Sequence, residues 1–161
     1  MRGLFAALVL ALPLAGAIVS ARADAAEAAA QESAQGIPDR QVSTMKLRMD
    51  LEGTAITATL VDNPTSREFI SLLPLTLTLT DYAGTEKIGD LPRRLTTEGA
   101  PVGSDPSVGS IAYYAPWGNL AIYYRYFGYS RGLVQLGKID SDVEALSGPD
   151  PLRVTIELVE E

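Results

Sequence analysis

The residues of this sequence that are most suited to forming a functional site are aromatic, and they are clustered. Residues 113–129 hold eight of the eleven Phe, Trp and Tyr side chains of the chain. They flank Pro116-Trp117-Gly118-Asn119, a predicted four-residue turn between two strands. Aromatic side chains stabilise hairpins as cross-strand pairs, and they also line ligand sites. The cluster therefore predicts a structural ladder or, alternatively, a binding surface.

The two-residue period of a strand divides the side chains around this turn between two faces. Ile111 and Tyr113 are expected to face the core, whereas Tyr114, Tyr123 and Arg125 are expected to face away from it and to stay in contact with solvent. An arginine beside two tyrosines suits recognition of a carbonyl or carboxylate group. The candidate ligand-binding residues of the whole chain are Arg93, Arg94, Glu98, Tyr114, Trp117, Asn119, Tyr123 and Arg125.

Three charged members of this set lie before the aromatic cluster. Arg93, which precedes Arg94, shares its strand parity with two leucines, so its guanidinium requires an acidic partner or a groove. An ion pair is the simpler interpretation. Glu98 begins a Gly- and Pro-rich loop over residues 98–109. Loops of about 12 residues are often functional, although a plain surface loop is the simpler interpretation here.

The amino-acid composition excludes several kinds of chemistry. The chain has no cysteine and no histidine, so it can form no disulfide, thiolate or imidazole site and no Ser-His-Asp triad. Its formal charge of −7 argues against a nucleic-acid partner. Asp140 and Asp142 are interpreted as helix-capping residues rather than as cation ligands. We expect no catalytic residue, no metal and no cofactor.

The first residues of the chain indicate export from a bacterial cytoplasm. Arg2 precedes an uncharged run over residues 4–19, and Ala21-Arg22-Ala23 matches the small-x-small pattern that signal peptidase cleaves. The run is shorter than the ~20 apolar residues of a membrane span. We expect a periplasmic or secreted protein without membrane association after cleavage. Its predicted parts are a signal peptide over residues 1–23, an Ala-rich disordered linker over 24–44 and a folded domain over 45–161.

The domain has the sequence period of β-strands. Leu75, Leu77 and Leu79 alternate with threonines, and apolar and polar residues alternate in the same way over residues 45–49, 56–60 and 152–158. This alternation is typical of antiparallel strands with one buried face.

Two short helices interrupt the strands. The pairs Thr65 with Glu68 and Ser141 with Glu144 have the spacing of capping boxes, and Pro74 ends the first helix. About eight strands and two helices predict a mainly β fold. We expect a closed, eight-stranded antiparallel barrel with a helix over each open end, since closure removes exposed sheet edges.

Several segments together carry a resemblance to a known family. The most specific is the block over residues 113–120, Tyr-Tyr-Ala-Pro-Trp-Gly-Asn-Leu; the others are Asn63-Pro64-Thr65, Leu73-Pro74-Leu75, Glu86-Lys87-Ile88 and Leu91-Pro92-Arg93-Arg94-Leu95. With these segments, residues 45–161 resemble the bacterial cyclophilin-like fold family. The resemblance implies the cyclophilin architecture, an eight-stranded barrel capped by two helices.

Two functions are compatible with this resemblance. Cyclophilins are peptidyl-prolyl isomerases, but this chain has no histidine and no Phe-His-Arg motif. We therefore favour a non-catalytic module that binds a small molecule or peptide on the aromatic face. The alternative is a peptidyl-prolyl cis-trans isomerase of low activity. In that case Arg93 or Arg94 would take the place of the arginine in the cyclophilin groove, and Trp117 that of its tryptophan. This reaction needs no nucleophile, because it only twists an amide bond.

Overall fold

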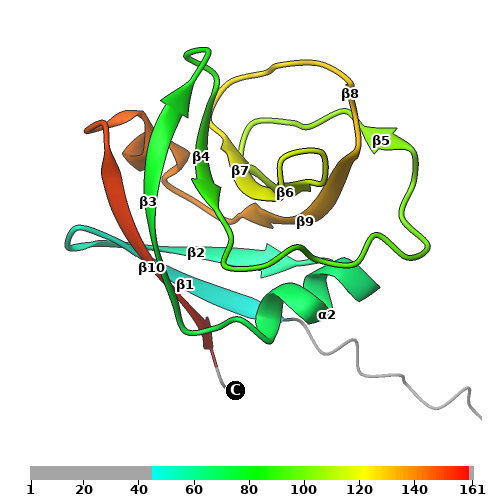
Figure 1. Cartoon of the computed structure of the whole chain (residues 1–161). Coiled ribbons are helices and arrows are strands. Elements are labelled where there is room, and N and C mark those ends of the chain that lie inside the picture. The colour runs from blue at the N-terminus through cyan, green and yellow to red at the C-terminus, as the bar shows by residue number, and fades with distance from the viewer. Residues whose placement is uncertain (1–44, 160–161) are drawn as a thin grey trace, which may run out of the picture. The chain divides into compact units, whose positions relative to one another are not determined.

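Alternating apolar and polar residues form the strands of this domain, as predicted. The computed structural model describes residues 45–159, and eight of their strands close into a barrel (Figure 1). The strand order around the barrel is β1-β10-β3-β4-β7-β6-β9-β2, and each assigned pair is antiparallel. The strands are β1 (Lys46–Leu51), β2 (Thr54–Leu60), β3 (Leu75–Tyr82), β4 (Glu86–Asp90), β6 (Ser110–Tyr114), β7 (Asn119–Tyr123), β9 (Leu133–Ile139) and β10 (Leu152–Val159). The predicted closed, eight-stranded architecture is confirmed.

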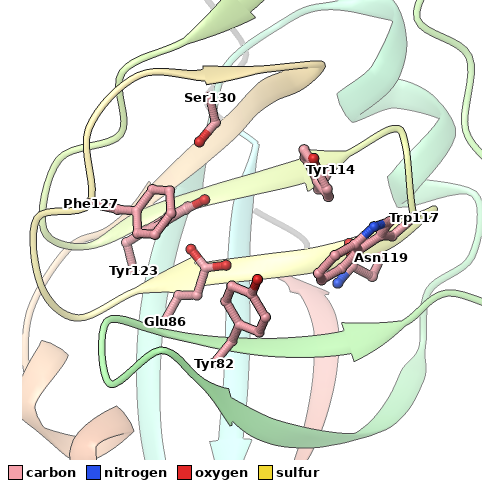
Figure 2. Close-up of a pocket in the computed structure, with 8 residues that line it drawn as sticks. All are labelled: Tyr82, Glu86, Tyr114, Trp117, Asn119, Tyr123, Phe127 and Ser130. Atoms are coloured by element: carbon pink, nitrogen blue, oxygen red, sulfur yellow. The ribbon is translucent and has the colours of Figure 1, made fainter.

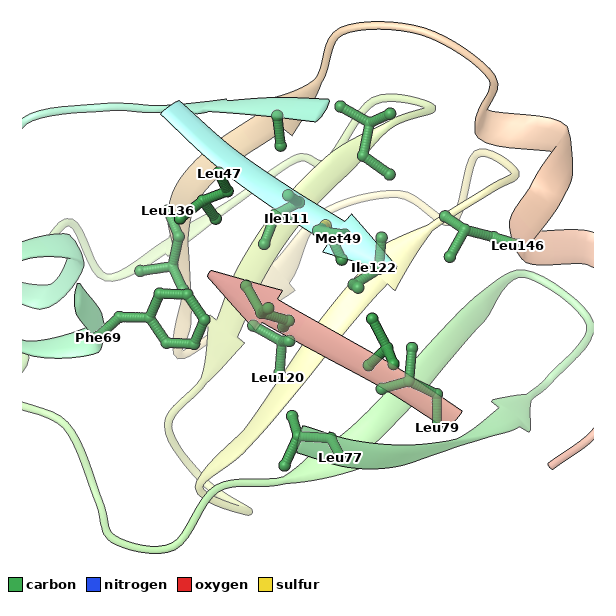
Figure 3. Close-up of a cluster of buried hydrophobic side chains, with 14 of the residues drawn as sticks. Leu47, Met49, Phe69, Leu77, Leu79, Ile111, Leu120, Ile122, Leu136 and Leu146 are labelled. Carbon is green, nitrogen blue, oxygen red and sulfur yellow. The ribbon is translucent and has the colours of Figure 1, made fainter. Parts of the chain in front are cut away.

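The inward faces of these strands form one hydrophobic core (Figure 3). Leu47 and Met49 of β1 are fully buried in it, and so is Leu79 of β3. Glu52 and Gly53 connect β1 to β2 with φ angles of 53° and 100°. Two positive φ values are what a two-residue type I′ hairpin turn requires.

Helix α2 (Pro64–Ile70) begins at a different cap from the one predicted. Asn63 is the N-cap residue, and its side-chain oxygen accepts a hydrogen bond of 2.8 Å from the backbone N–H of Ser66. The predicted capping box of Thr65 and Glu68 is wrong, because both side chains bond to the segment that follows β4 instead. That long-range partner is absent from the local sequence pattern.

The second predicted helix is a single 3-10 turn, Val143–Ser147. Asp142 occupies its N-cap position with a left-handed backbone and makes no side-chain capping bond, and the capping box predicted to begin at Ser141 does not form. Asp140 accepts a hydrogen bond from Lys46 instead of capping the turn. The capping interpretation of both aspartates is therefore wrong.

Both helical segments nevertheless cover the core. Phe69 of α2 and Leu146 of the 3-10 turn are fully buried, and they enter the core from opposite sides in Figure 3. The two predicted capping helices are thus one short α-helix and one 3-10 turn. Within residues 45–159, no helix has the length and apolar character needed to cross a membrane.

A small two-stranded ribbon lies outside the barrel. It pairs β5 (Gly103–Ser104) with β8 (Ser130–Arg131) (Figure 1). The hydroxyl of Ser104 donates to the backbone oxygen of Leu133, which ties the ribbon to β9. The sequence predicted an irregular loop over residues 98–109, which contain β5, and gave no prediction for β8, because two-residue strands show no periodicity. The predicted signal peptide and linker, residues 1–23 and 24–44, lie outside the described residues.

Candidate binding site

The candidate site begins with two rows of side chains on the outer face of the barrel. In the first row, Tyr82, Glu86 and Tyr123 lie opposite one another across β3, β4 and β7. In the second row, Asn119 of β7 lies opposite Tyr114 of β6. Side chains alternate between the faces of a strand, so all five project away from the core.

The covering segment, which follows β7 and extends to Gly132, encloses part of this outer face. The chain after β7 runs back over β6 and meets β5: Ala115 N donates to the carbonyl of Gly132, and Gly132 N donates to the carbonyl of Val102. Beneath it, Tyr123 is only 2% exposed and packs in a second hydrophobic cluster with Leu133. The expectation that the Tyr123 side chain stays in contact with solvent is therefore wrong, because a segment distant in sequence covers it.

Between the two rows and the covering segment lies a pocket of about 90 Å³ (Figure 2). This volume suits a group the size of an amino-acid side chain, since pockets for drug-sized ligands are typically about 300–1,000 Å³. The residues that line it are Tyr82, Glu86, Tyr114, Trp117, Asn119, Tyr123, Phe127 and Ser130.

Aromatic rings form the rim of the pocket. The Trp117 ring lies 5.4 Å from that of Tyr82 and 5.3 Å from that of Tyr114, with interplanar angles of 84° and 81°. Phe127 lies on the other side, 6.4 Å from the ring of Tyr123. Trp117, Tyr82 and Phe127 are exposed to solvent. The rim thus presents ring faces and edges that a ligand can contact without opening the barrel.

The floor of the pocket is polar and incompletely hydrogen-bonded. Glu86 is 7% exposed and Asn119 is 2% exposed, yet Glu86 Oε2 and Asn119 Oδ1 are buried without a hydrogen-bond partner within residues 45–159. A buried polar atom without a partner costs free energy. A ligand that donates hydrogen bonds would remove part of this cost.

Burial changes the acidity of two floor residues. Burial raises the pKa of the Glu86 carboxyl above its ordinary value, and the neighbouring Tyr123 hydroxyl acts in the opposite direction. The pKa of Tyr123 is raised, first by burial and then by Glu86. Both shifts show that this floor disfavours negative charge in the free protein.

Half of the sequence-predicted site residues come together at this pocket. Tyr114, Trp117, Asn119 and Tyr123 line it. Glu98 lines a separate, mostly apolar pocket of about 210 Å³ beside α2. The ligand-binding role of all five remains a prediction.

The three predicted arginines do not line the pocket. Arg93 forms an ion pair with Glu68, which is the simpler alternative that its parity predicted. Arg94 donates to the carbonyl of Ala115 at 2.7 Å, and so supports the turn that carries Trp117. Arg125 follows the end of β7, where strand parity no longer applies.

Arg125 lies beside a different ring. Its guanidinium carbon is 5.7 Å from the centre of the Tyr124 ring, and Nη1 donates to the carbonyl of Gly84 at 3.3 Å. The predicted arrangement of Arg125 with Tyr114 and Tyr123 is therefore wrong. Among the described residues, 45–159, no guanidinium lines the pocket to bind a carboxylate.

Sequence reasoning missed four lining residues: Tyr82, Glu86, Phe127 and Ser130. Glu86 shares the parity of Ile88 on the outer face of β4, and a glutamate beside apolar neighbours is the one local signal of a polar floor. Phe127 belongs to the aromatic cluster over residues 113–129, but it was not singled out because it follows the end of β7. Tyr82 and Ser130 could not be found locally, because they arrive through the β3–β4 pairing and through the covering segment.

The comparisons with known proteins concern the same barrel. The model of the Cyclophilin-like family matches residues 49–157. The solution structure of the hypothetical protein AF2241 from Archaeoglobus fulgidus is similar, with a TM-score of 0.55 and 20% sequence identity. The alignment covers 74% of this chain and 98% of that one. At this identity, the likeness shows the fold alone.

No curated protein matches the chain. The family model, in contrast, spans the barrel from β1 to β10, including every strand that contributes to the pocket. The chain therefore belongs to the Cyclophilin-like family.

Proposed function

We propose that the domain is an exported, non-catalytic binding module that holds a small molecule or a peptide side chain in the pocket between Trp117 and Glu86. One observation carries this proposal: exposed aromatic rings surround a floor whose buried polar atoms lack partners. Apolar walls with a few convergent polar groups are typical of ligand sites.

The strands that form the floor support binding with little rearrangement. Glu86 and Tyr123 occupy paired positions at the start of β4 and the end of β7, two strands that pair along their whole length within the barrel. Groups held by paired strands lose little conformational entropy when a ligand binds, so a larger part of the interaction energy contributes to the affinity.

Trp117 provides a direct test, because it is the only tryptophan in the chain. We expect a bound ligand to change Trp117 emission, since the ring forms part of the rim. A panel of metabolites and short peptides would be titrated against the protein while emission is recorded. Tyr82→Ala should weaken any response at least tenfold, because it removes the ring that packs against Trp117.

Tyr126→Ala is the matched control, because Tyr126 is an exposed aromatic residue that does not line the pocket. A panel that produces no emission change, or a response equally sensitive to both substitutions, would contradict the proposed site.

The alternative of a weak prolyl isomerase has less support. Its proposed donors, Arg93 and Arg94, donate to Glu68 and to the carbonyl of Ala115. A protease-coupled prolyl-peptide assay at several protein concentrations separates the two functions. We expect no rate enhancement; an enhancement that Arg93→Ala or Arg94→Ala abolishes would establish the isomerase instead.

Export is the second part of the proposal, and it rests on the pattern of residues 1–23. Mass spectrometry of the protein expressed with its full N-terminus in a bacterial host should find a periplasmic form that begins at Asp24, or at Ala26 if the second small-x-small site, Ala23-Asp24-Ala25, is cleaved. An uncleaved cytoplasmic form would contradict export.

A further inference from the structure

We infer that the pocket selects a small alkylammonium group, primary or methylated, of its ligand. The inference rests on the proposed binding function and specifies the chemistry of that same site. Its basis is the combination of one carboxyl group, no basic side chain and a rim of aromatic rings.

The carboxyl group of Glu86 lacks a charged partner. Among residues 45–159, no ion pair includes it, and the residues that line the pocket include neither lysine nor arginine. A buried carboxylate without a cation is unfavourable, and one with a hydrogen-bonded cation is far less so. A positively charged N–H donor therefore complements both the charge and the unpartnered acceptor atoms of this floor, whereas a compact quaternary nitrogen complements the charge alone.

The rim is arranged as the walls of a cation site. Tyr82, Trp117 and Tyr114 form a chain of near-perpendicular rings, and Phe127 lies across the pocket from them (Figure 2). Aromatic faces attract cations, and cages of several rings recognise alkylated ammonium groups. Such a cage has little to offer an anion.

Size and overall charge agree with this chemistry. The volume of about 90 Å³ accommodates an ammonium head group rather than a whole metabolite. The formal charge of the chain is −7, so the long-range field favours the approach of cations and disfavours that of anions. Phe127 of the covering segment lines the pocket, and a ligand larger than this volume would keep its remainder outside.

The decisive experiment compares a cation with its neutral isostere. Choline and 3,3-dimethyl-1-butanol have the same shape and differ in charge, and N-acetyl-lysine amide supplies a primary ammonium. Each compound would be titrated into the full-length protein while Trp117 emission is recorded, and its binding would also be measured by calorimetry. We expect choline or the lysine derivative to bind at least tenfold more tightly than 3,3-dimethyl-1-butanol.

Glu86→Gln keeps the size of the side chain and removes its charge, so it should reduce this preference at least fivefold and leave only the contribution of the aromatic rings. Tyr126→Ala should retain it. Circular dichroism checks that both variants are folded. The comparison within the wild-type protein does not depend on either variant.

The outcomes separate this inference from the proposed function. If neither choline nor the lysine derivative binds more tightly than 3,3-dimethyl-1-butanol, the selectivity for cations is overturned but the pocket still functions. The same holds if no ammonium probe binds while another compound changes Trp117 emission in a Tyr82-dependent way. Failure of every compound to bind overturns both.

Discussion

At the scale of single residues, Glu86 lies where its charge reduces the stability of the barrel. Its carboxyl is buried, its Oε2 has no partner within residues 45–159, and burial raises its pKa. The folded state therefore binds the proton more tightly than the unfolded state does. The associated stability is present below the ordinary pKa of a glutamate and is lost as pH rises through the higher pKa of the folded state.

We accordingly expect Glu86→Gln to be more stable than the wild type at pH 7, by about 1–2 kcal/mol. The difference should become small near pH 3, more than one unit below the ordinary glutamate pKa of about 4.3, because the wild-type carboxyl is then mostly protonated in both states. Urea unfolding at the two pH values measures it.

The exposed Glu157 provides the control, since Glu157→Gln should leave the free energy of unfolding unchanged at both pH values. The other titratable side chains of the pocket are Tyr82, Tyr114 and Tyr123. Of these, the pKa of Tyr123 is raised, so it stays neutral throughout this range. A Glu86→Gln variant that is less stable at pH 7 would show that the carboxylate has a favourable role in the fold.

Residue parity predicted the site only as far as the strands extend. Tyr114 and Tyr123 project outward as predicted, because both belong to strands of the barrel. Arg125 does not, because β7 ends at Tyr123 and the next residues turn toward β3 and β4. Glu86 was missed because its role depends on which strand lies beside β4, and pairing is not encoded in one strand alone.

At the scale of elements, the β5–β8 ribbon contributes Ser130 to the lining of the pocket. Gly103 lies so close to β8 that an added Cβ would meet the backbone oxygen of Ser130 at 2.3 Å and Cα of Arg131 at 2.8 Å. These are backbone atoms, so no side-chain rotation can relieve the contact. A larger residue at Gly103 must separate the two strands.

We expect Gly103→Ala to increase amide hydrogen exchange in the ribbon and to weaken ligand binding at the pocket at least fivefold. The free energy of unfolding of the barrel should change by less than about 1 kcal/mol, because a locally open segment contributes little to global stability. Exchange mass spectrometry and Trp117 titration measure the two effects.

Gly148→Ala is the matched substitution outside the ribbon. A Cβ at Gly148 would meet its nearest neighbour, the carbonyl of Ala145, at 3.4 Å. It should leave both the exchange of the ribbon and the binding unchanged. Unchanged exchange in Gly103→Ala would show that the ribbon does not depend on this close approach.

Sequence reasoning predicted the long elements and failed on the short ones. The strands over residues 45–49, 56–60 and 152–158 were found from their alternation, since each buries one face in the core. The two capping boxes were wrong because Glu68 has a better partner in Arg93 and because Asp142 adopts a left-handed backbone. The local spacing of residues predicts neither the ion pair of Glu68 nor the left-handed backbone of Asp142.

At the scale of the whole molecule, the barrel depends on a narrow seam between β2 and β9. Only three residue pairs join these strands, from Ala58 with Ile139 to Leu60 with Gly137. A Cβ at Gly137 would meet the carbonyl of Thr59 at 2.4 Å and Cα of Leu60 at 2.9 Å. The glycine therefore permits the close approach that completes the barrel.

We expect Gly137→Ala to lower the free energy of unfolding by about 2–4 kcal/mol, since overpacking against backbone forces a strand to move. The unfolding transition should remain cooperative, because all the barrel strands share one core. Urea denaturation followed by circular dichroism measures the change, again with Gly148→Ala for comparison. A loss below about 0.5 kcal/mol would show that the seam tolerates the extra carbon.

Closure itself was predicted from the number of strands and from the family resemblance, not from any local pattern. Alternation shows that a strand has one buried face, but it does not show which strand pairs with which. The order of strands around the barrel, and hence the position of β4 beside β7, required the structure.

The pairing of β1 with β10 brings the first and last strands of the domain together (Figure 1). A nascent chain that leaves the ribosome from its N-terminus cannot complete this pair until nearly all of the domain has been synthesised. Contacts so distant in sequence also form slowly. The order of synthesis therefore delays folding of the barrel, and a delay of this kind is what the proposed export of an unfolded polypeptide would require.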